Sequence, residues 1–139
     1  LVFEVVPMLK LSIITVTRDR PQLLANTIAS LEQQTSSDFE WIVINDGGDP
    51  KTKEIVSHVS FPLTYLEMAH PPTGFGLSIG RNRGLLTAQG DIITYLDDDN
   101  TFKPNFVAET IEFFDRHPQI NYAMPIQQRR RQTIELAMR

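Results

Sequence analysis

Three consecutive aspartates, Asp97, Asp98 and Asp99, are the residues of this sequence best suited to chemistry. They follow a short apolar run, residues 92–96, where a buried strand is expected to end. Adjacent carboxylates repel one another, and a divalent cation removes that repulsion. In an extended chain Asp97 and Asp99 point to one side, so the pattern predicts that both ligate Mg²⁺ or Mn²⁺, which would bridge a diphosphate. The alternatives are a solvated acidic loop or an N-cap for a helix that begins at Pro104.

A further carboxylate, Asp46, stands between Asn45 and the glycines Gly47 and Gly48. Glycines let the backbone turn sharply and approach a ligand closely. A carboxylate in such a turn could accept a hydrogen bond from the N–H of a nucleobase. The alternative is that Asp46 or Asp49 caps the helix that follows.

Glycines and two arginines, Arg81 and Arg83, accumulate over residues 74–84 at the expected start of a helix. Helix N-termini and guanidinium groups both favour phosphate, although a flexible loop with surface arginines would have the same composition. We expect one of the two arginines to face solvent. The Gly-Lys-Ser/Thr phosphate loop, the dinucleotide fingerprint, a Ser-His-Asp set and a metal-binding pair of histidines are all absent from the sequence.

The elements that must position these residues alternate along the chain. Short apolar runs of this kind predict strands that are buried on both faces of a sheet, and helical patterns lie between them. Strand–helix repetition predicts an α/β fold with a mostly parallel sheet covered by helices. The expected strands are residues 11–16, 41–44, 63–66 and 92–96, with 122–126 as a fifth, and the helices begin at Pro21, at 49–50, at Ile79 (ending at Ala88) and at Pro104.

In parallel sheets ligands bind outside the carboxyl ends of the strands. Polar, acidic or glycine-rich segments follow each of the four expected strands, so these segments should meet at one edge. They are residues 17–19, 45–49, 70–76 and 97–100.

Composition excludes several other functions. The chain has 139 residues, enough for one domain, and its net charge of -4 argues against nucleic acid as the main partner. There is no cysteine and no apolar run long enough to cross a membrane, which fits a cytoplasmic protein. We expect residues 1–9 to be a leader or extra edge strand, 10–126 the domain, and 127–139 a polar, basic tail that could form a helix.

The order and spacing of these motifs resemble the family 2 glycosyltransferases, which have the Rossmann-like GT-A fold. The resemblance covers residues 10–126, and each motif is modest alone but specific in this order. The matching elements are the opening strand through Pro21, Leu31 to Thr35, Asn45 to Gly48, Gly80 to Gly84, Gly90-Asp91, and Leu96 to Asn100 followed by Pro104.

The resemblance implies the role of each residue. Thr17 and Asp46 would contact the nucleoside, with Asp46 on the base, and Arg81 would help to bind the nucleotide. Asp97 and Asp98 would also lie at the nucleotide, and Asp97 and Asp99 would hold Mn²⁺ or Mg²⁺. The implied donor is a nucleoside diphosphate sugar, often a UDP-sugar, and the implied reaction is inverting transfer to a hydroxyl of a saccharide, lipid or protein.

The sequence departs from the family pattern in places. Asn45 replaces a usual aspartate, and Arg18 replaces a residue that is often aromatic or small. The chain is short relative to a full glycosyltransferase domain, and no candidate for the catalytic base is found in it. A non-catalytic donor-binding or assembly module is therefore the alternative, and self-association to a homo-oligomer is expected. A receiver or phosphotransfer domain is disfavoured, because the aspartates follow the fourth strand and no lysine follows Lys103.

Overall fold

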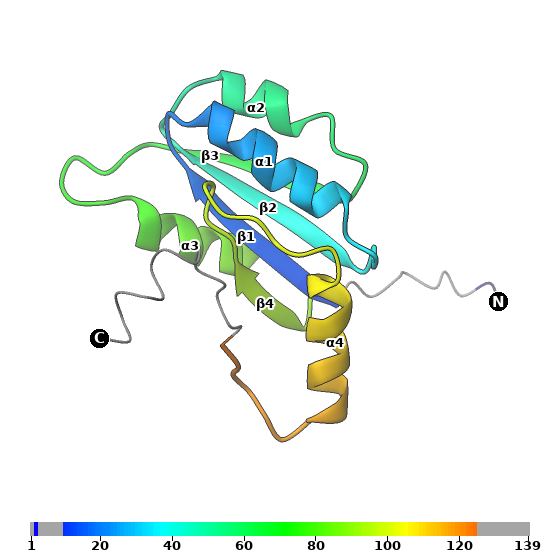
Figure 1. The fold of residues 1–139 in the computed structure, drawn as a ribbon. Helices are drawn as coiled ribbons and strands as arrows, with labels where there is room; N and C mark the ends of the chain where they lie inside the picture. The colour runs from blue at the N-terminus through cyan, green and yellow to red at the C-terminus, as the bar shows by residue number, and fades with distance from the viewer. Residues whose placement is uncertain (1, 3–9, 125–139) are drawn as a thin grey trace, which may run out of the picture.

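The computed structural model describes residues 2 and 10–124, and Figure 1 shows the arrangement. Four parallel strands form one sheet in the order β3-β2-β1-β4. Their β-branched and aromatic side chains favour extended backbone. The strands are β1 (Leu11–Thr17), β2 (Phe39–Asp46), β3 (Leu63–Met68) and β4 (Ile92–Tyr95).

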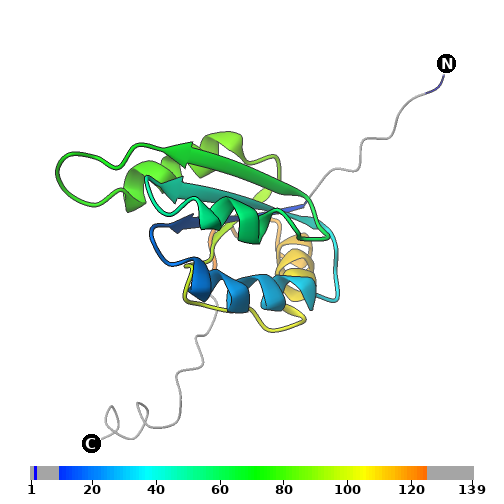
Figure 2. The same ribbon diagram turned by 90° about the horizontal axis from the view of Figure 1, so that it is seen from above.

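Helices cover both faces of this sheet (Figure 2). Helices α1, α2 and α4 pack against one face, where they share a core with Leu11, Ile13 and Trp41. Helix α3 packs against β1 and β2 on the other face. The helices are α1 (Pro21–Glu32), α2 (Lys51–Val56), α3 (Leu77–Thr87) and α4 (Phe106–Arg116).

Helix α3 approaches the sheet closely because glycines form its inner side. A Cβ added at Gly80 would lie 2.8 Å from both methyl carbons of Val16, and one added at Gly84 would lie 2.4 Å from Cγ2 of Ile14. Larger residues at these two positions would push the helix away from β1. The glycines that the sequence suggested for phosphate binding therefore also set the distance between α3 and the strands.

The α/β fold class and the parallel sheet expected from the sequence are confirmed. Helix α2 ends at Val56, so Val59 lies beyond it, and α4 begins two residues after Pro104. The expected fifth strand is wrong over residues 122–124, which form no regular element, and its last residues lie outside the described range. The expected N-terminal edge strand and helical tail also lie outside it. Among the described helices, none has both the length and the apolar character of a membrane span.

Candidate functional site

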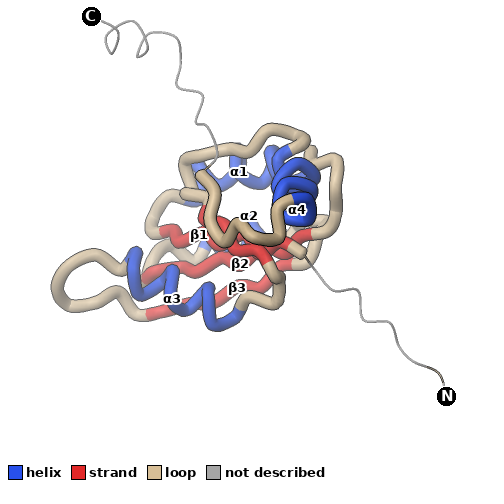
Figure 3. The backbone as a smooth tube through the Cα atoms, turned by 90° about the horizontal axis from the view of Figure 1, so that it is seen from below, coloured by secondary structure: helices blue, strands red, loops and turns tan. Residues whose placement is uncertain are grey.

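The order in which strands are added to the sheet reverses between β1 and β4, whose carboxyl ends lie side by side. From β1 the chain adds β2 and then β3 on one side, and it returns to place β4 on the other side of β1. Strands in register bring Thr17 opposite Asn45, and Ile14 opposite Tyr95. The connection after β3 projects as a long loop beside α3 (Figure 3). Such a reversal is where open α/β sheets bind ligands.

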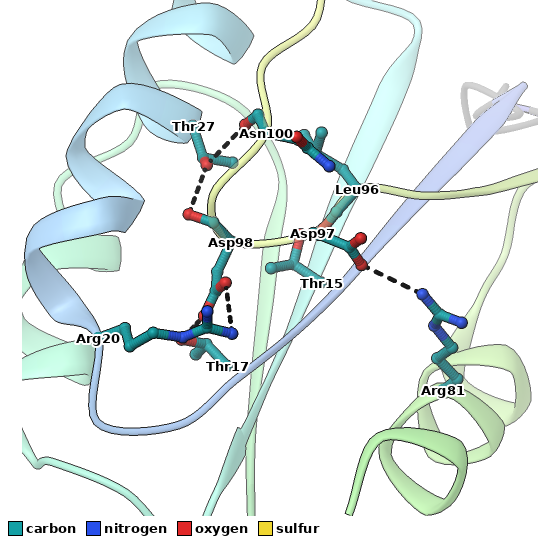
Figure 4. A network of polar contacts seen from close by, with 9 residues as sticks. All are labelled: Thr15, Thr17, Arg20, Thr27, Arg81, Leu96, Asp97, Asp98 and Asn100. Carbon is teal, nitrogen blue, oxygen red and sulfur yellow. Dashed lines mark hydrogen bonds and ion pairs between the residues drawn. The ribbon is translucent and has the colours of Figure 1, made fainter. Parts of the chain in front are cut away.

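Asp98 is the aspartate of the triplet that turns inward. Its side chain is 1% exposed, Thr17 Oγ1 donates to its Oδ2 at 2.7 Å, and Arg20 Nη2 lies 2.9 Å from its Oδ1 (Figure 4). Burial raises the pKa of the Asp98 carboxyl above its ordinary value, against the opposing effects of the Thr17 hydrogen bond and the Arg20 charge. The carboxylates of Asp99 and Asp97 raise that pKa further.

Two residues that contact Asp98 had no signal in the sequence that singled them out: Arg20, and Thr27, whose Oγ1 lies 3.1 Å from the Asp98 carbonyl oxygen. Arg20 lies in the connection between β1 and α1, and its side chain is half exposed. Thr27 is buried on the core side of α1, where its spacing from Leu24 and Leu31 suggests an apolar contact. Their contacts with Asp98 form only because β4 lies beside β1, and the sequence around Arg20 and Thr27 gives no sign of that pairing.

Asp97 and Asp99 are exposed on either side of the buried Asp98. Arg81 Nη2 lies 3.1 Å from Asp97 Oδ1, and the Arg81 guanidinium lies 4.8 Å from the centre of the Tyr95 ring. Figure 4 shows the Asp97 side chain directed towards Arg81 and the Asp98 side chain directed towards Arg20. Arg83 faces solvent, which answers the expectation that one of the two arginines would do so. The helix caps are Pro50 for α2 and Asn105 for α4, so the aspartate triplet caps neither helix.

Asp97 and Asp99 could each offer carboxylate oxygens to a hard divalent cation that is shared with a ligand. The extended backbone expected here is wrong, because residues 98–99 form a turn. The described residues contain no group of three or more histidine, cysteine, aspartate or glutamate residues able to hold a metal alone. Mg²⁺ in nucleotide enzymes is commonly bound by one or two carboxylates together with phosphates and water, and Mn²⁺ takes the same oxygen ligands. Asp97, which lies beside Arg81, and the exposed Asp99 are the residues that could supply the protein ligands of such a site.

Asp46, the carboxylate expected at the nucleobase, is covered. Its side chain is 6% exposed, and His70 Nδ1 lies 2.8 Å from its Oδ2. Its Oδ1 is buried without a hydrogen-bond partner among the described residues. A Cβ added at Gly76 would lie 1.9 Å from Oδ2, so the start of α3 also lies against this carboxylate. Asp49 Oδ1 accepts a hydrogen bond at 2.9 Å from the backbone N–H of Lys51, the first residue of α2. Asp49 and not Asp46 therefore contacts the start of this helix.

A hollow of about 380 Å³ lies beside Asp46, at the carboxyl ends of β2 and β3. Asp46 itself does not line it, which agrees with the covered position of its carboxylate. The lining residues are Asn45, Gly47, Gly48, Pro50, Glu67, Met68 and Ala69.

The fold is shared with solved glycosyltransferase structures. Staphylococcus aureus TarS, solved in complex with UDP-GlcNAc, matches 85% of this chain with a TM-score of 0.71 at 22% identity, over 37% of its own chain. Mannosyltransferase PcManGT from Pyrobaculum calidifontis, solved with GDP-Man and Mn²⁺, matches 67% of this chain with a TM-score of 0.58 at 19% identity, over 28% of its own chain. At these identities the likeness establishes the GT-A fold alone.

Sequence comparison establishes more than the fold. An uncharacterized glycosyltransferase of Haemophilus influenzae is 34% identical over 112 residues, which cover 81% of this chain and 37% of that protein. The chain thus spans little more than a third of this relative. The family model described as glycosyl transferase family 2 matches residues 12–137. With nearly the whole chain matched and the GT-A fold in place, this chain belongs to glycosyl transferase family 2.

Proposed function

We propose that this chain binds the donor of a glycosyl transfer reaction, a nucleoside diphosphate sugar with UDP as the nucleotide, together with Mn²⁺ or Mg²⁺. One observation carries the proposal. Two exposed carboxylates, Asp97 and Asp99, follow β4, next to the point where the order of the strands reverses. The Arg81 guanidinium lies 3.1 Å from Asp97. In a family 2 chain, this combination of anionic and cationic groups suits a metal-bound diphosphate.

Asp97 and Asp99 are the proposed metal ligands, and a bound metal supplies positive charge that stabilises the diphosphate as a leaving group. Arg81 lies beside them and offers planar N–H donors to phosphate oxygens. Its present partner is Asp97 Oδ1 at 3.1 Å, so a phosphate and Asp97 compete for the same guanidinium. In the proposal both residues lie at the nucleotide: Arg81 binds a phosphate and Asp97 binds the metal that the phosphate shares.

Asp46 and Thr17 are the proposed nucleoside contacts. The unpartnered, buried Oδ1 of Asp46 is an acceptor that a nucleobase N–H would satisfy. The Thr17 hydroxyl is already donated to Asp98, so Thr17 is left to contact the nucleoside through its other atoms. The Asp98 carboxylate is buried, so we assign it no direct contact with the nucleotide. The proposed role of Asp98 is to fix the turn that carries Asp97 and Asp99.

The known structures support this choice of ligands. TarS was solved with UDP-GlcNAc, and PcManGT with GDP-Man and Mn²⁺. The proposed reaction is inverting transfer of the sugar to an acceptor hydroxyl on a saccharide, lipid or protein. That step needs a base to accept the proton of the hydroxyl, and we assign that role to none of residues 10–124.

Calorimetric titration of UDP, with GDP for comparison, in the presence and absence of Mn²⁺ tests the proposal. UDP should bind with Mn²⁺ and bind at least tenfold more weakly without it. The double variant Asp97→Asn/Asp99→Asn should lose the dependence on metal. The control Glu54→Gln/Glu112→Gln removes the same charge from two exposed positions on α2 and α4 and should keep it. Metal-dependent binding that survives Asp97→Asn/Asp99→Asn would refute the site.

A further inference from the structure

Two side chains of helix α1 and one that lies two residues past its end bind the backbone of the connection from β4 to α4. Thr27 Oγ1 lies 3.1 Å from the carbonyl oxygen of Asp98 and 2.9 Å from that of Asn100. Ser30 Oγ accepts from the N–H of Phe102 at 3.3 Å. Gln34 donates to the carbonyl of Lys103 at 2.7 Å and accepts from the N–H of Val107 at 3.0 Å. We call Thr27, Ser30 and Gln34 the α1 polar row.

This row is unusual for the side of a helix that faces a core. Thr27 is fully buried and Ser30 is 8% exposed, at positions where apolar side chains would otherwise bury their surface. Buried hydroxyls are costly unless they are hydrogen-bonded, and here each one satisfies loop backbone that has no strand or helix partner. The row therefore trades apolar burial for control of a loop.

The end of that loop nearest the sheet is also held through its side chain. The Asp98 carboxylate is fixed by Thr17 from β1 and by Arg20, while the Asp98 carbonyl is fixed by Thr27 from α1. Groups from three segments thus hold one residue through its backbone and its side chain. Asp98 is held inward, and its neighbours Asp97 and Asp99 are exposed on either side of it, in a turn that the N–H of Asn100 closes on the Asp97 carbonyl at 3.0 Å.

We propose that the α1 polar row, and Thr27 above all, is a positioning element for the carboxylates of Asp97 and Asp99. This inference rests on the proposed function, since it concerns the same metal and diphosphate. Thr27 touches neither carboxylate. It fixes the backbone between them, as outer hydrogen bonds fix the ligands of metal sites in general.

The sharp test is Thr27→Val, which keeps nearly the same shape, changes no charge and removes only the hydroxyl. The Mn²⁺ concentration that gives half-maximal UDP binding should rise about tenfold, as expected when an outer hydrogen bond of a metal site is lost. Thr27→Ser restores the hydroxyl and should restore the Mn²⁺ requirement. Thermal unfolding of each variant is followed alongside, so that a change in stability is separated from a change in metal affinity.

Thr52→Val is the matched control. Thr52 is a fully buried threonine on α2 whose Oγ1 has no hydrogen-bond partner among the described residues. Its replacement should leave the Mn²⁺ requirement unchanged. If Thr27→Val does not fold, Gln34→Leu takes its place, because Gln34 is only partly buried, and it should raise the Mn²⁺ requirement about threefold.

The outcomes separate the inference from the proposed function. If the unaltered chain binds UDP with Mn²⁺ and folded Thr27→Val does so with the same Mn²⁺ requirement, the inference is wrong and the proposed function stands. A failure of Thr27→Ser to recover that requirement also overturns the inference. If the unaltered chain shows no metal-dependent binding of UDP, the proposed function is wrong and the inference falls with it.

Discussion

His70 Nδ1 lies 2.8 Å from Oδ2 of Asp46, and this contact joins the loop after β3 to the end of β2. The carboxylate of Asp46 is covered by that loop and by Gly76 at the start of α3. A nucleobase that bonds to Asp46 must therefore displace part of this cover. Under the proposed function, His70 and the nucleobase would therefore compete for one carboxylate.

Replacement of His70 by alanine should increase affinity for UDP about 3- to 10-fold, because the net free energy of one competing hydrogen bond is lost. The same change should lower the free energy of unfolding by about 1–3 kcal/mol, since Asp46 then lacks a partner. Calorimetry with UDP and urea unfolding measure the two effects. His58→Ala, at an exposed histidine after α2, should change neither. Weaker binding of UDP by His70→Ala would mean that His70 helps Asp46 to bind the nucleobase instead of competing with the nucleobase for Asp46.

Gly76→Ala should abolish UDP binding, because the new Cβ would lie 1.9 Å from Asp46 Oδ2 and 2.5 Å from Oδ1. Relief of that clash requires α3 or Asp46 to shift, at a cost of about 1–3 kcal/mol in stability. Gly74→Ala provides the comparison. Gly74 has φ +81° with no atom within 4 Å of an added Cβ, so alanine there strains only the exposed loop. UDP binding by Gly76→Ala at the affinity of Gly74→Ala would contradict this account.

The buried Asp98 gives a pH prediction with a definite sign. Its pKa is raised above 3.8 in the folded chain, so the folded chain holds this proton more tightly than the unfolded chain does. Its contribution to stability is therefore full below the unfolded pKa and is lost as pH rises through the folded pKa. Asp98→Asn does not titrate, so its stability relative to the unaltered chain should rise with pH over this window.

Urea unfolding without divalent metal, from about pH 4 to about pH 7, measures that difference. The prediction concerns the slope with pH and not the absolute stability, because asparagine also loses the ion pair with Arg20. Parallel curves for the two proteins would show that Asp98 has no raised pKa. Asp115→Asn is a suitable comparison, since Asp115 is exposed on α4.

Arg81→Gln should weaken UDP binding in the presence of Mn²⁺ about tenfold, because the glutamine cannot offer a paired, charged donor to phosphate. It should also reduce the fall in affinity as salt concentration rises. Arg83→Gln is a close control, since Arg83 lies on the same helix and faces solvent. Equal losses in the two variants would point to the general charge of α3 instead of a contact by Arg81. Titrations at two salt concentrations distinguish these cases.

Much of the fold was predictable because the residue pattern within each strand and helix is enough to identify it. The β-branched runs ending at Thr17 and Asp46 can be buried on both faces only in a covered sheet. Element ends were less predictable. Val59 has the right spacing to continue α2, but the helix ends at Val56. Tyr122 and Met124 are apolar, yet both are exposed outside any strand.

The site was predictable in its location and only partly in its contacts. Asp97 was expected at the end of a strand and Arg81 near the start of a helix, and the structure brings the two side chains to 3.1 Å. The partners of Asp46 and Asp98 depend instead on how distant segments pack. His70 reaches Asp46 from 24 residues away, and no local pattern encodes that contact. Whether these residues bind a nucleotide and a metal stays a prediction for the experiments above.

The position of β4 at the end of the sheet order has a consequence for how the site comes into being. The Thr17–Asp98 contact joins residues that are 81 positions apart in the sequence. Contacts with such a large sequence separation form slowly during folding. During synthesis, β1, β2 and β3 are complete before β4 leaves the ribosome, and a nascent chain that ends before Asp98 cannot form this contact. Hydrogen exchange should find β4 to be among the first strands to open, since within residues 10–124 it pairs with β1 alone, over four residues. Any ligand that touches both Thr17 and the 97–99 turn would clamp this strand in place and slow the exchange of its amides.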